Sequence, residues 1–251
     1  MKYIGSKNRL SKELAPIIQS YIKEDTAGYL EPFVGGANMI DKIKHYNRIG
    51  CDIHKQLIAL LNKAKDDIDG IPNEITEDEY NRVKNNKEAY EDWYVGLVGF
   101  CATFGAKYFG GYARDRQGNR NIPKEGIRNL KKQNLKGIEF RCCNFLELST
   151  FENYVIYCDI PYKETTKYST IKFPYEEFYE WAKEISKHNI VLISEYNMPD
   201  EFECIWQKES KVNFDSNRES SSKRIEKLFT YSYFRGWING NWTNKDGRKF
   251  I

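Results

Sequence analysis

One segment of the chain is an apolar run that ends abruptly in polar residues, Tyr154-Val155-Ile156-Tyr157-Cys158-Asp159-Ile160-Pro161-Tyr162. The apolar part predicts a buried strand. Pro161 lacks a backbone N–H, so the chain must leave a central strand at that point. In open α/β sheets, ligands bind where strands end at their carboxyl edge. We therefore expect a binding site at Asp159–Tyr162, built from one carboxylate, turned-out carbonyls and one aromatic ring.

These groups suit a planar base that carries an exocyclic amino group. The base can stack on Tyr162, while Asp159 and a backbone carbonyl near Ile160 accept the amino hydrogens. Asp-Ile-Pro-Tyr resembles the Asp-Pro-Pro-Tyr motif of amino-methylating DNA methyltransferases. An ordinary strand that ends in a capping Asp and a turn Pro would have the same four-residue sequence, so these residues alone leave both interpretations open. The family usually has Pro in place of Ile160, and because a carbonyl is what the site uses, we expect activity to survive.

The composition is that of a globular protein. The chain has 251 residues, of which 40% are hydrophobic and 30% charged, enough for one large domain or one domain with an insert. No apolar run approaches the roughly 20 residues of a membrane span, and the first residues lack an apolar signal region. The six Cys form no C-x-x-C pair and the three His do not space like ligands, which predicts reduced cytosolic thiols and no metal.

A second motif follows a short strand that ends at Pro32, in the stretch Tyr29-Leu30-Glu31-Pro32-Phe33-Val34-Gly35-Gly36-Ala37-Asn38-Met39. Glycines let a backbone approach a ligand closely, and a helix expected from Asn38 to Tyr46 would add positive potential at its N-terminus. The next strand ends at Asp52, where an acid can accept from ribose hydroxyls. G-x-G-x-x-G is missing, so the dinucleotide fingerprint is not met. A generic strand–turn–helix is the alternative.

Both motifs, in this order, resemble Dam-like (D12 class, alpha group) S-adenosylmethionine-dependent DNA adenine methyltransferases, phage-type members included. The resemblance implies that the cofactor's methionine end and ribose are bound by Tyr3, Gly5, Lys7, Glu31, Phe33, Gly35, Gly36, Asp52 and Asp159. It implies that the cofactor's adenine lies between Asn144 and Phe145, although the family has Asp where this chain has Asn144. It makes Asp159, Ile160, Pro161 and Tyr162 the catalytic set. Asp rather than Ser at the first position of that set favours adenine over cytosine.

The segment from Phe100 to Lys136 is strongly basic. It has nine Lys or Arg and two acids, a balance of +7 that leaves −4 for the rest of the chain. Such a patch predicts a polyanionic partner, and Gln117-Gly118 predicts the turn of a β-hairpin. The resemblance places target recognition here, with DNA bound by Lys107, Tyr112, Arg114, Arg116, Asn119 and Arg120. A solvated charged loop is the alternative.

The expected fold is α/β, a doubly wound, mostly parallel sheet of the Rossmann-like methyltransferase type. A late antiparallel strand pair is expected at Phe202–Trp206 and Leu228–Tyr233. Residues 1–57 and 137–251 would form the catalytic, S-adenosylmethionine-binding domain. Residues 58–136 would form an inserted target-recognition domain, helical at first, with Thr76 as a helix N-cap.

The expected function is site-specific transfer of a methyl group from S-adenosylmethionine to the amino group of a flipped-out adenine in double-stranded DNA. S-adenosylhomocysteine would be the product, and neither a metal nor a membrane would be involved. We expect a monomer or weak dimer in the cytoplasm of a bacterium, or of the host when the protein is phage-encoded. The sequence leaves open the recognition site and whether a restriction nuclease is the partner.

Three rival interpretations remain at this stage. The first is an amino-methyltransferase that acts on RNA, cytosine or a protein amide. The second is a DNA-binding protein with a decayed site, given Ile160 and Asn144. The third is a nicotinamide oxidoreductase, which the missing glycine fingerprint disfavours.

Overall fold

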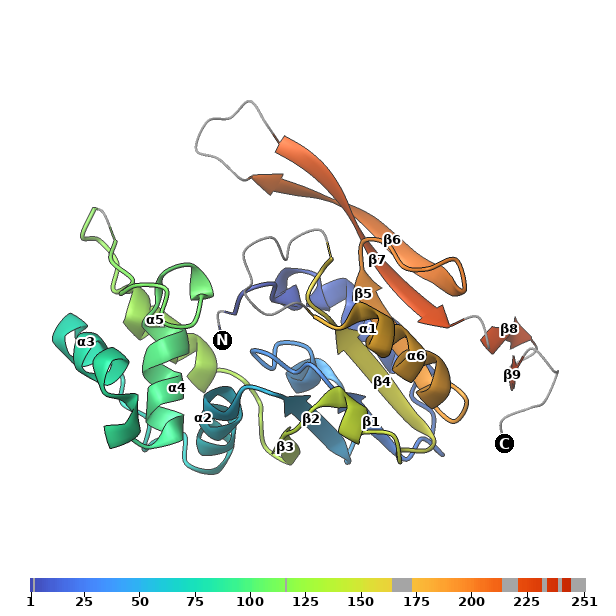
Figure 1. The fold of residues 1–251 in the computed structure, drawn as a ribbon, viewed down its shortest axis with the longest axis horizontal. Helices are drawn as coiled ribbons and strands as arrows, with labels where there is room; N and C mark the ends of the chain where they lie inside the picture. The colour runs from blue at the N-terminus through green and yellow to red at the C-terminus, as the bar shows by residue number, and fades with distance from the viewer. Residues whose placement is uncertain are drawn as a thin grey trace. The chain divides into compact units, whose positions relative to one another are not determined.

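The structure is a computed structural model that describes residues 1, 3–115, 117–163, 173–213, 221–231, 234–238 and 241–244. The chain forms two compact units, the first comprising Met1–Lys23 and Gly28–Glu147 and the second comprising Glu24–Ala27 and Leu148–Ile251. Figure 1 shows the helices and strands in chain order. Within the described residues, no helix is long and apolar enough to cross a membrane.

The first unit contributes three parallel strands in the order β3-β2-β1. The pairing aligns Tyr29 with Arg48 and Asp52 with Cys142. All four residues of the first strand are buried, as expected for a parallel strand covered on both faces. The bounds are Gly28–Glu31 for β1, Arg48–Asp52 for β2 and Ile138–Cys142 for β3.

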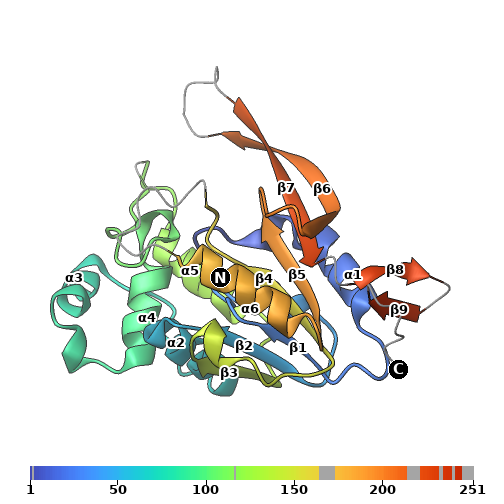
Figure 2. The same ribbon diagram turned by 45° about the vertical axis from the view of Figure 1, so that its right-hand side comes forward.

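The helices of the first unit pack closely on one another and on the sheet. Helix α2 contacts β2 and β3, while α4 contacts α2, α3 and α5. A Cβ added at Gly96 in α4 would lie 2.1 Å from the carbonyl oxygen of Gln56, so glycine permits this approach. Figure 2 shows these helices from a second direction. The helices are α1 (Ser11–Tyr21), α2 (Lys55–Asp66), α3 (Glu77–Asn85), α4 (Asp92–Cys101) and α5 (Ile122–Lys131).

Short 3-10 turns connect these elements: η1 (Lys7–Arg9), η2 (Ile40–Lys42), η3 (Lys87–Ala89), η4 (Phe104–Ala106) and η5 (Phe145–Glu147). The predicted N-cap at Thr76 is confirmed. Its hydroxyl accepts from the Glu79 N–H, and the Glu79 carboxylate accepts from the Thr76 N–H, which is a capping box.

The second unit contributes four strands in the order β4-β5-β7-β6. Strands β4 and β5 are parallel, and β7 pairs antiparallel with both β5 and β6. The predicted late antiparallel pair is therefore confirmed, with longer strands than expected. The elements are β4 (Tyr154–Asp159), α6 (Tyr175–Ile185), β5 (Ile190–Glu195), β6 (Phe202–Asn213) and β7 (Ser221–Tyr231), followed by a separate pair, β8 (Phe234–Ile238) and β9 (Asn241–Asn244).

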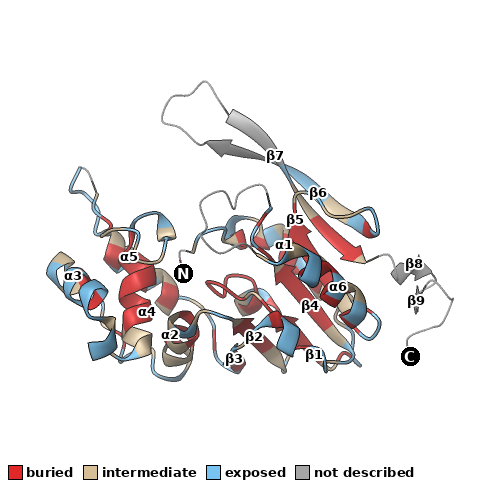
Figure 3. Ribbon diagram, viewed as in Figure 1, coloured by how far each residue is buried: buried red, intermediate tan, exposed pale blue. Residues whose placement is uncertain are grey.

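The α/β class predicted from the sequence is confirmed, because the seven strands make a mostly parallel sheet with helices between them. Figure 3 shows that the strands are buried along their middle, β1 and β2 in the first unit and β4 and β5 in the second. The predicted insert, residues 58–136, lies within the first unit. Its role as a separate recognition domain stays a prediction.

Two local predictions were wrong. The helix expected from Asn38 to Tyr46 is reduced to the single turn η2, because the backbone of Ile43 is extended. The β-hairpin expected at Gln117-Gly118 is a turn in a loop instead, closed by a bond from the Gly118 N–H to the Asp115 carbonyl. The Asp115 carboxylate also accepts from backbone N–H groups at residues 119 and 120, so these need no partner strand.

Candidate active site

The glycine turn after β1 lies against the ring of Tyr3. A Cβ added at Gly35 would come within 2.8 Å of the Tyr3 ring, and one added at Gly36 within 2.8 Å of the Tyr3 Cβ. Gly35 also has a φ of +47°, which side chains other than glycine rarely adopt. On its other side the Tyr3 ring lies 5.7 Å from the ring of Phe100. The two glycines are thus required by the close approach of an aromatic ring.

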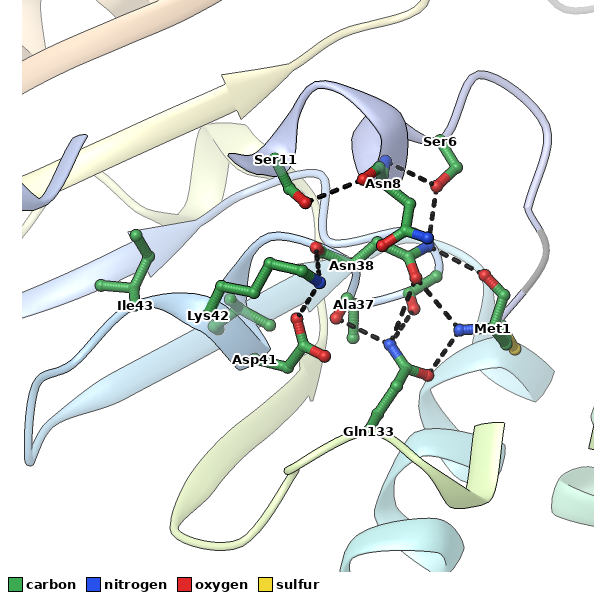
Figure 4. A network of polar contacts seen from close by, with 12 residues as sticks. Met1, Ser6, Asn8, Ser11, Ala37, Asn38, Asp41, Lys42, Ile43 and Gln133 are labelled. Carbon is green, nitrogen blue, oxygen red and sulfur yellow. Dashed lines mark hydrogen bonds and ion pairs between the residues drawn. The ribbon is translucent and has the colours of Figure 1, made fainter. Parts of the chain in front are cut away.

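The side-chain amide of Gln133 donates hydrogen bonds to the backbone of the same turn, as Figure 4 shows. The Gln133 Nε2 donates to the carbonyls of Gly36 and Ala37, both at 2.9 Å. The Asn38 Nδ2 donates to the Ser6 hydroxyl at 2.9 Å. Gln133 follows α5 and is distant from the turn in sequence, so a segment next to the basic loop fixes the glycine turn.

Asp52, at the end of β2, joins that strand to the glycine turn. Its Oδ2 accepts from the Gly35 N–H at 3.2 Å and its Oδ1 from the His54 N–H at 2.9 Å. Burial raises the pKa of the Asp52 carboxyl, and these backbone hydrogen bonds oppose that effect. The following residue, Ile53, is 70% exposed, which is unusual for a large apolar side chain beside a buried strand. An acid and an exposed apolar surface therefore lie together next to the turn.

Phe145, predicted beside the cofactor's adenine, lies next to Phe33, which was predicted at the methionine end. The rings of Phe33 and Phe145 have centroids 5.5 Å apart. Asn144 caps η5, since its Oδ1 accepts from the Leu146 N–H at 3.1 Å and its own N–H donates to the Glu147 carboxylate at 2.7 Å. The side-chain oxygen of Asn144 thus has a structural role that the sequence did not predict.

Two charged residues from the predicted cofactor set are buried in the first unit. Glu31, the last residue of β1, is 3% exposed and accepts from the Tyr29 hydroxyl at 2.7 Å. Lys7 lies in η1 and is also buried. Because isolated buried charges are costly, such positions are typical of functional or paired groups.

The Asp-Ile-Pro-Tyr motif leaves the sheet at the end of β4, as predicted. Asp159 is the last residue of that strand and the side chain of Ile160 is buried. The Tyr175 hydroxyl donates to the Pro161 carbonyl at 2.7 Å. The Ile160 side chain therefore packs into the protein, while the backbone of the motif is held from α6.

Tyr162 is buried and its hydroxyl donates to the Glu226 Oε2 of β7 at 3.0 Å. Burial raises the pKa of Tyr162 well above its usual value, and the carboxylates of Asp159 and Glu226 raise it further. Tyr162 consequently keeps its proton and acts as a hydrogen-bond donor.

Two further residues, Glu195 and Tyr196, were missed by the sequence argument. Glu195 is 1% exposed and ends β5. Its Oε2 accepts from the Lys163 N–H at 3.0 Å and its Oε1 from the Tyr196 N–H at 2.6 Å. The rings of Tyr162 and Tyr196 meet edge to face, with centroids 4.4 Å apart. The rule applied to Asp159, that acids at strand ends line sites, could have found Glu195.

The predicted DNA-binding arginines carry acidic partners. Arg114 pairs with Glu77 of α3, and the Arg120 Nε donates to Glu125 of α5 at 2.9 Å. Both arginine side chains are more than half exposed. Together with Asp115 they line a shallow cavity of about 270 Å³. A polyanion at this surface would compete with carboxylates for the two guanidinium groups.

The other predicted DNA-binding residues differ in exposure. Lys107 and Asn119 are exposed, and Arg116 lies outside the described residues. Tyr112 is half-buried, its hydroxyl donates to the Ile75 carbonyl at 2.9 Å, and its ring lies 5.7 Å from that of Tyr80. Tyr112 therefore has a packing role in the first unit.

The comparisons with known proteins agree with the motifs. No curated protein sequence matches the chain. A solved structure of the "putative methylase HI0767" from Haemophilus influenzae is 10% identical and covers 89% of this chain and 97% of that one. Its TM-score of 0.34 is too low to bear on fold or function. Residues 3–93 match the sequence model of the D12 class N6 adenine-specific DNA methyltransferases. The resemblance drawn from the sequence is thus confirmed over residues 3–93, which are similar to this family of adenine-specific DNA methyltransferases.

Proposed function

We propose that this protein transfers a methyl group from S-adenosylmethionine to the exocyclic amino group of an adenine that has been flipped out of duplex DNA. The observation that carries the proposal is the position of Asp159 and Tyr162 at the carboxyl end of β4, with the ring held by hydrogen bonding. Ligands of open α/β sheets bind at such strand ends. The family match over residues 3–93 supplies the class of reaction.

The residues of the first unit fit the cofactor on two observations. Added side chains at Gly35 and Gly36 would clash with Tyr3, so the absence of side chains there lets Tyr3 pack on the turn that the resemblance assigns to the cofactor's methionine end. The Asp52 carboxyl is shielded and stays within reach of this turn, which suits acceptance from ribose hydroxyls. The exposed side chain of Ile53 offers an apolar surface for the adenine ring. When bound, the cofactor would supply an electrophilic methyl group on a sulfonium.

The target amino group would be activated by acceptors alone. Its lone pair is normally delocalised into the ring, which makes it a poor nucleophile. Asp159 and the Ile160 carbonyl would accept the two amino hydrogens and favour a pyramidal nitrogen with a localised lone pair. The Pro161 carbonyl already accepts from Tyr175, so the Ile160 carbonyl is the better candidate. The nitrogen would gain a positive charge on methylation and then lose one proton, which the Asp159 carboxylate would receive.

Most of the rate would come from positioning and from electrostatics. Stacking on Tyr162 would fix the plane of the base, and the nearby carboxylate of Asp159 would stabilise the positive charge that develops on the amino nitrogen. An adenine inside a duplex cannot reach such a pocket, so it must first leave the stack. The basic loop that carries Lys107, Arg114 and Arg120 supplies the phosphate contacts for this step.

The direct test is incubation of the protein with radiolabelled S-adenosylmethionine and mixed-sequence duplex DNA. Digestion to nucleosides then identifies the labelled base, which should be N6-methyladenine. Asp159→Ala should bind the cofactor and transfer nothing. Label in cytosine, RNA or protein would replace this proposal by one of its rivals, and no cofactor binding by the natural sequence would favour a decayed enzyme.

A further inference from the structure

The ring of Tyr162 is fixed from two directions before any base is present. Its hydroxyl donates to Glu226, a residue of the antiparallel strand β7. Its ring and the ring of Tyr196 meet edge to face, at an interplanar angle of 81°. With 8% of its surface exposed, the side chain has little room to rotate. Such an arrangement holds a stacking surface in one orientation.

The backbone next to the Tyr162 ring is held by the buried carboxylate of Glu195. Glu195 accepts from the N–H of Lys163, which follows Tyr162, and from the N–H of Tyr196. One buried carboxylate thereby ties the two chain segments that carry the two contacting rings. Charge-assisted hydrogen bonds to a buried carboxylate are among the stronger ones in proteins. Tyr162 is thus restrained at its hydroxyl, by the ring of Tyr196 and along the chain.

We propose that Glu226 is a positioning residue that acts through the hydroxyl of Tyr162 and sets the plane on which a flipped purine with an exocyclic amine stacks. This inference rests on the proposed function and deepens it. Glu226 touches neither reacting atom, so its contribution passes through the tyrosine ring. Glu195 serves the same end through the backbone.

The hydrogen bond also changes the ring itself. A phenol that donates to a carboxylate gains electron density over its π-face, and this face is attracted to positive charge. Because the tyrosine keeps its proton, the ring remains a neutral, electron-rich surface. The base stacked on that ring acquires positive charge as its amino group is methylated. A stronger cation–π attraction in the transition state than in the ground state would raise the rate of the chemical step.

A double-mutant cycle tests this role, using Tyr162→Phe, Glu226→Gln and both together. The measured quantity is the single-turnover rate of methyl transfer to duplex DNA at saturating labelled S-adenosylmethionine. We expect Glu226→Gln to slow transfer roughly 10-fold, the scale of one hydrogen bond to a charged group. In the Tyr162→Phe background, which lacks the hydroxyl, the same substitution should change the rate less than about 2-fold. Equal fold-losses in both backgrounds would overturn the proposal.

Glu203→Gln is the matched control, because Glu203 is an exposed acid on the adjoining strand β6, where it pairs in register with Thr230. It should leave the transfer rate unchanged. A merely structural role for Glu226 would lower the melting temperature and leave single-turnover transfer by the folded fraction intact. If Glu226→Gln does not fold, Tyr162→Phe decides, since a phenylalanine enzyme with the natural rate refutes the role of the hydroxyl.

The flipped base provides a second readout. With 2-aminopurine at the target position, its fluorescence should rise on binding to the natural protein and rise less with Glu226→Gln, since a disordered ring stacks the base less well. An unchanged signal together with an unchanged rate would count against positioning. Absence of any methyl transfer by the natural protein would refute the proposed function itself, whereas an active protein with independent effects would refute only this inference.

Discussion

Replacing Gln133 with leucine should weaken binding of the cofactor, although Gln133 is not one of the residues expected to contact the cofactor. Gln133 donates to the carbonyls of Gly36 and Ala37, and its side chain reaches them from the segment that follows α5. Leucine has a similar volume but no donor, so both carbonyls would lose their partner. The glycine turn would then be ordered by fewer bonds in the free protein.

The magnitude follows from the two hydrogen bonds, which have donor–acceptor distances of 2.9 Å each. A neutral hydrogen bond contributes about 1 kcal/mol to stability, so the turn would be less ordered by about 2 kcal/mol. Since about 1.4 kcal/mol corresponds to a tenfold change in a binding constant, the dissociation constant should rise up to about 30-fold. The full effect appears only if the turn must be ordered before the cofactor binds.

The assay is titration calorimetry with S-adenosylhomocysteine, the expected product. The matched control is Gln19→Leu, because Gln19 also makes two bonds to a backbone, donating to the Lys44 carbonyl at 3.1 Å and accepting from its N–H at 2.8 Å. Both variants should lose stability in urea denaturation, the Gln133 variant more because its side-chain oxygen also accepts from the Met1 ammonium at 2.6 Å. Only the Gln133 variant should lose affinity. Equal affinities for both variants would show that the glycine turn needs no support from Gln133 and would refute the reasoning.

Three further outcomes are expected. Cofactor affinity should fall as the pH is lowered, and the fall should begin above the ordinary pKa range of an Asp carboxyl, because burial raises the pKa of Asp52 and only its ionised form accepts from two hydroxyls. The Asp52→Asn variant should bind the cofactor weakly at every pH. A pH dependence that persists in this variant would show that another group titrates. In a filter-binding assay, Arg114→Ala should weaken binding to duplex DNA and reduce the slope of log affinity against log salt by about 1. Glu77→Gln, which releases the Arg114 guanidinium, should strengthen binding in the same assay. Weaker binding by the Glu77 variant would contradict the idea that Glu77 and DNA compete for Arg114. Gly96→Ala should cost about 1–3 kcal/mol in urea denaturation, because its Cβ would overlap the Gln56 carbonyl, and natural stability would mean that α2 and α4 are further apart than described.

The sequence predicted those features of the site that depend on strands and their ends. An apolar run followed by Asp159 and Pro161 can end a buried strand at only one point, and the structure ends β4 at that residue. The same reasoning located Asp52 at the end of β2. Strand ends are predictable because burial imposes a run of apolar residues that stops where solvent or a ligand begins.

The predictions that were wrong concern segments whose backbone groups are satisfied by side chains rather than by a regular ladder. The Asp115 carboxylate accepts from two backbone N–H groups in the loop, where a hairpin had been expected. At Ile43 an extended backbone interrupts the expected helix. Local periodicity cannot report either feature, since a single side chain or dihedral angle replaces several hydrogen bonds of a helix or hairpin.

The residues that sequence reasoning missed are distant in the chain from the groups they serve. Glu226 follows Tyr162 by 64 positions, and Gln133 follows Gly36 by 97. Neither residue belongs to a motif, because a supporting hydrogen bond needs only one acceptor or donor at the right place. Contacts of this kind appear only once the strands are paired and the chain is folded.

The late antiparallel strands offer a physical reason for the expectation that activity survives with Ile160 in the motif. In Asp-Pro-Pro-Tyr the second residue stiffens the backbone through its fixed φ, which reduces the freedom of the neighbouring tyrosine. Here the side chain at that position is 2% exposed and packs into the protein, so it cannot touch a base. The stiffness that a second proline would provide comes from outside the motif instead, through the bond of β7 to the Tyr162 hydroxyl and the bond of Glu195 to the following N–H. A chain with isoleucine in the motif therefore depends more on Glu195 and Glu226 than one with two prolines, and substitution of either acid should be partly compensated by Ile160→Pro.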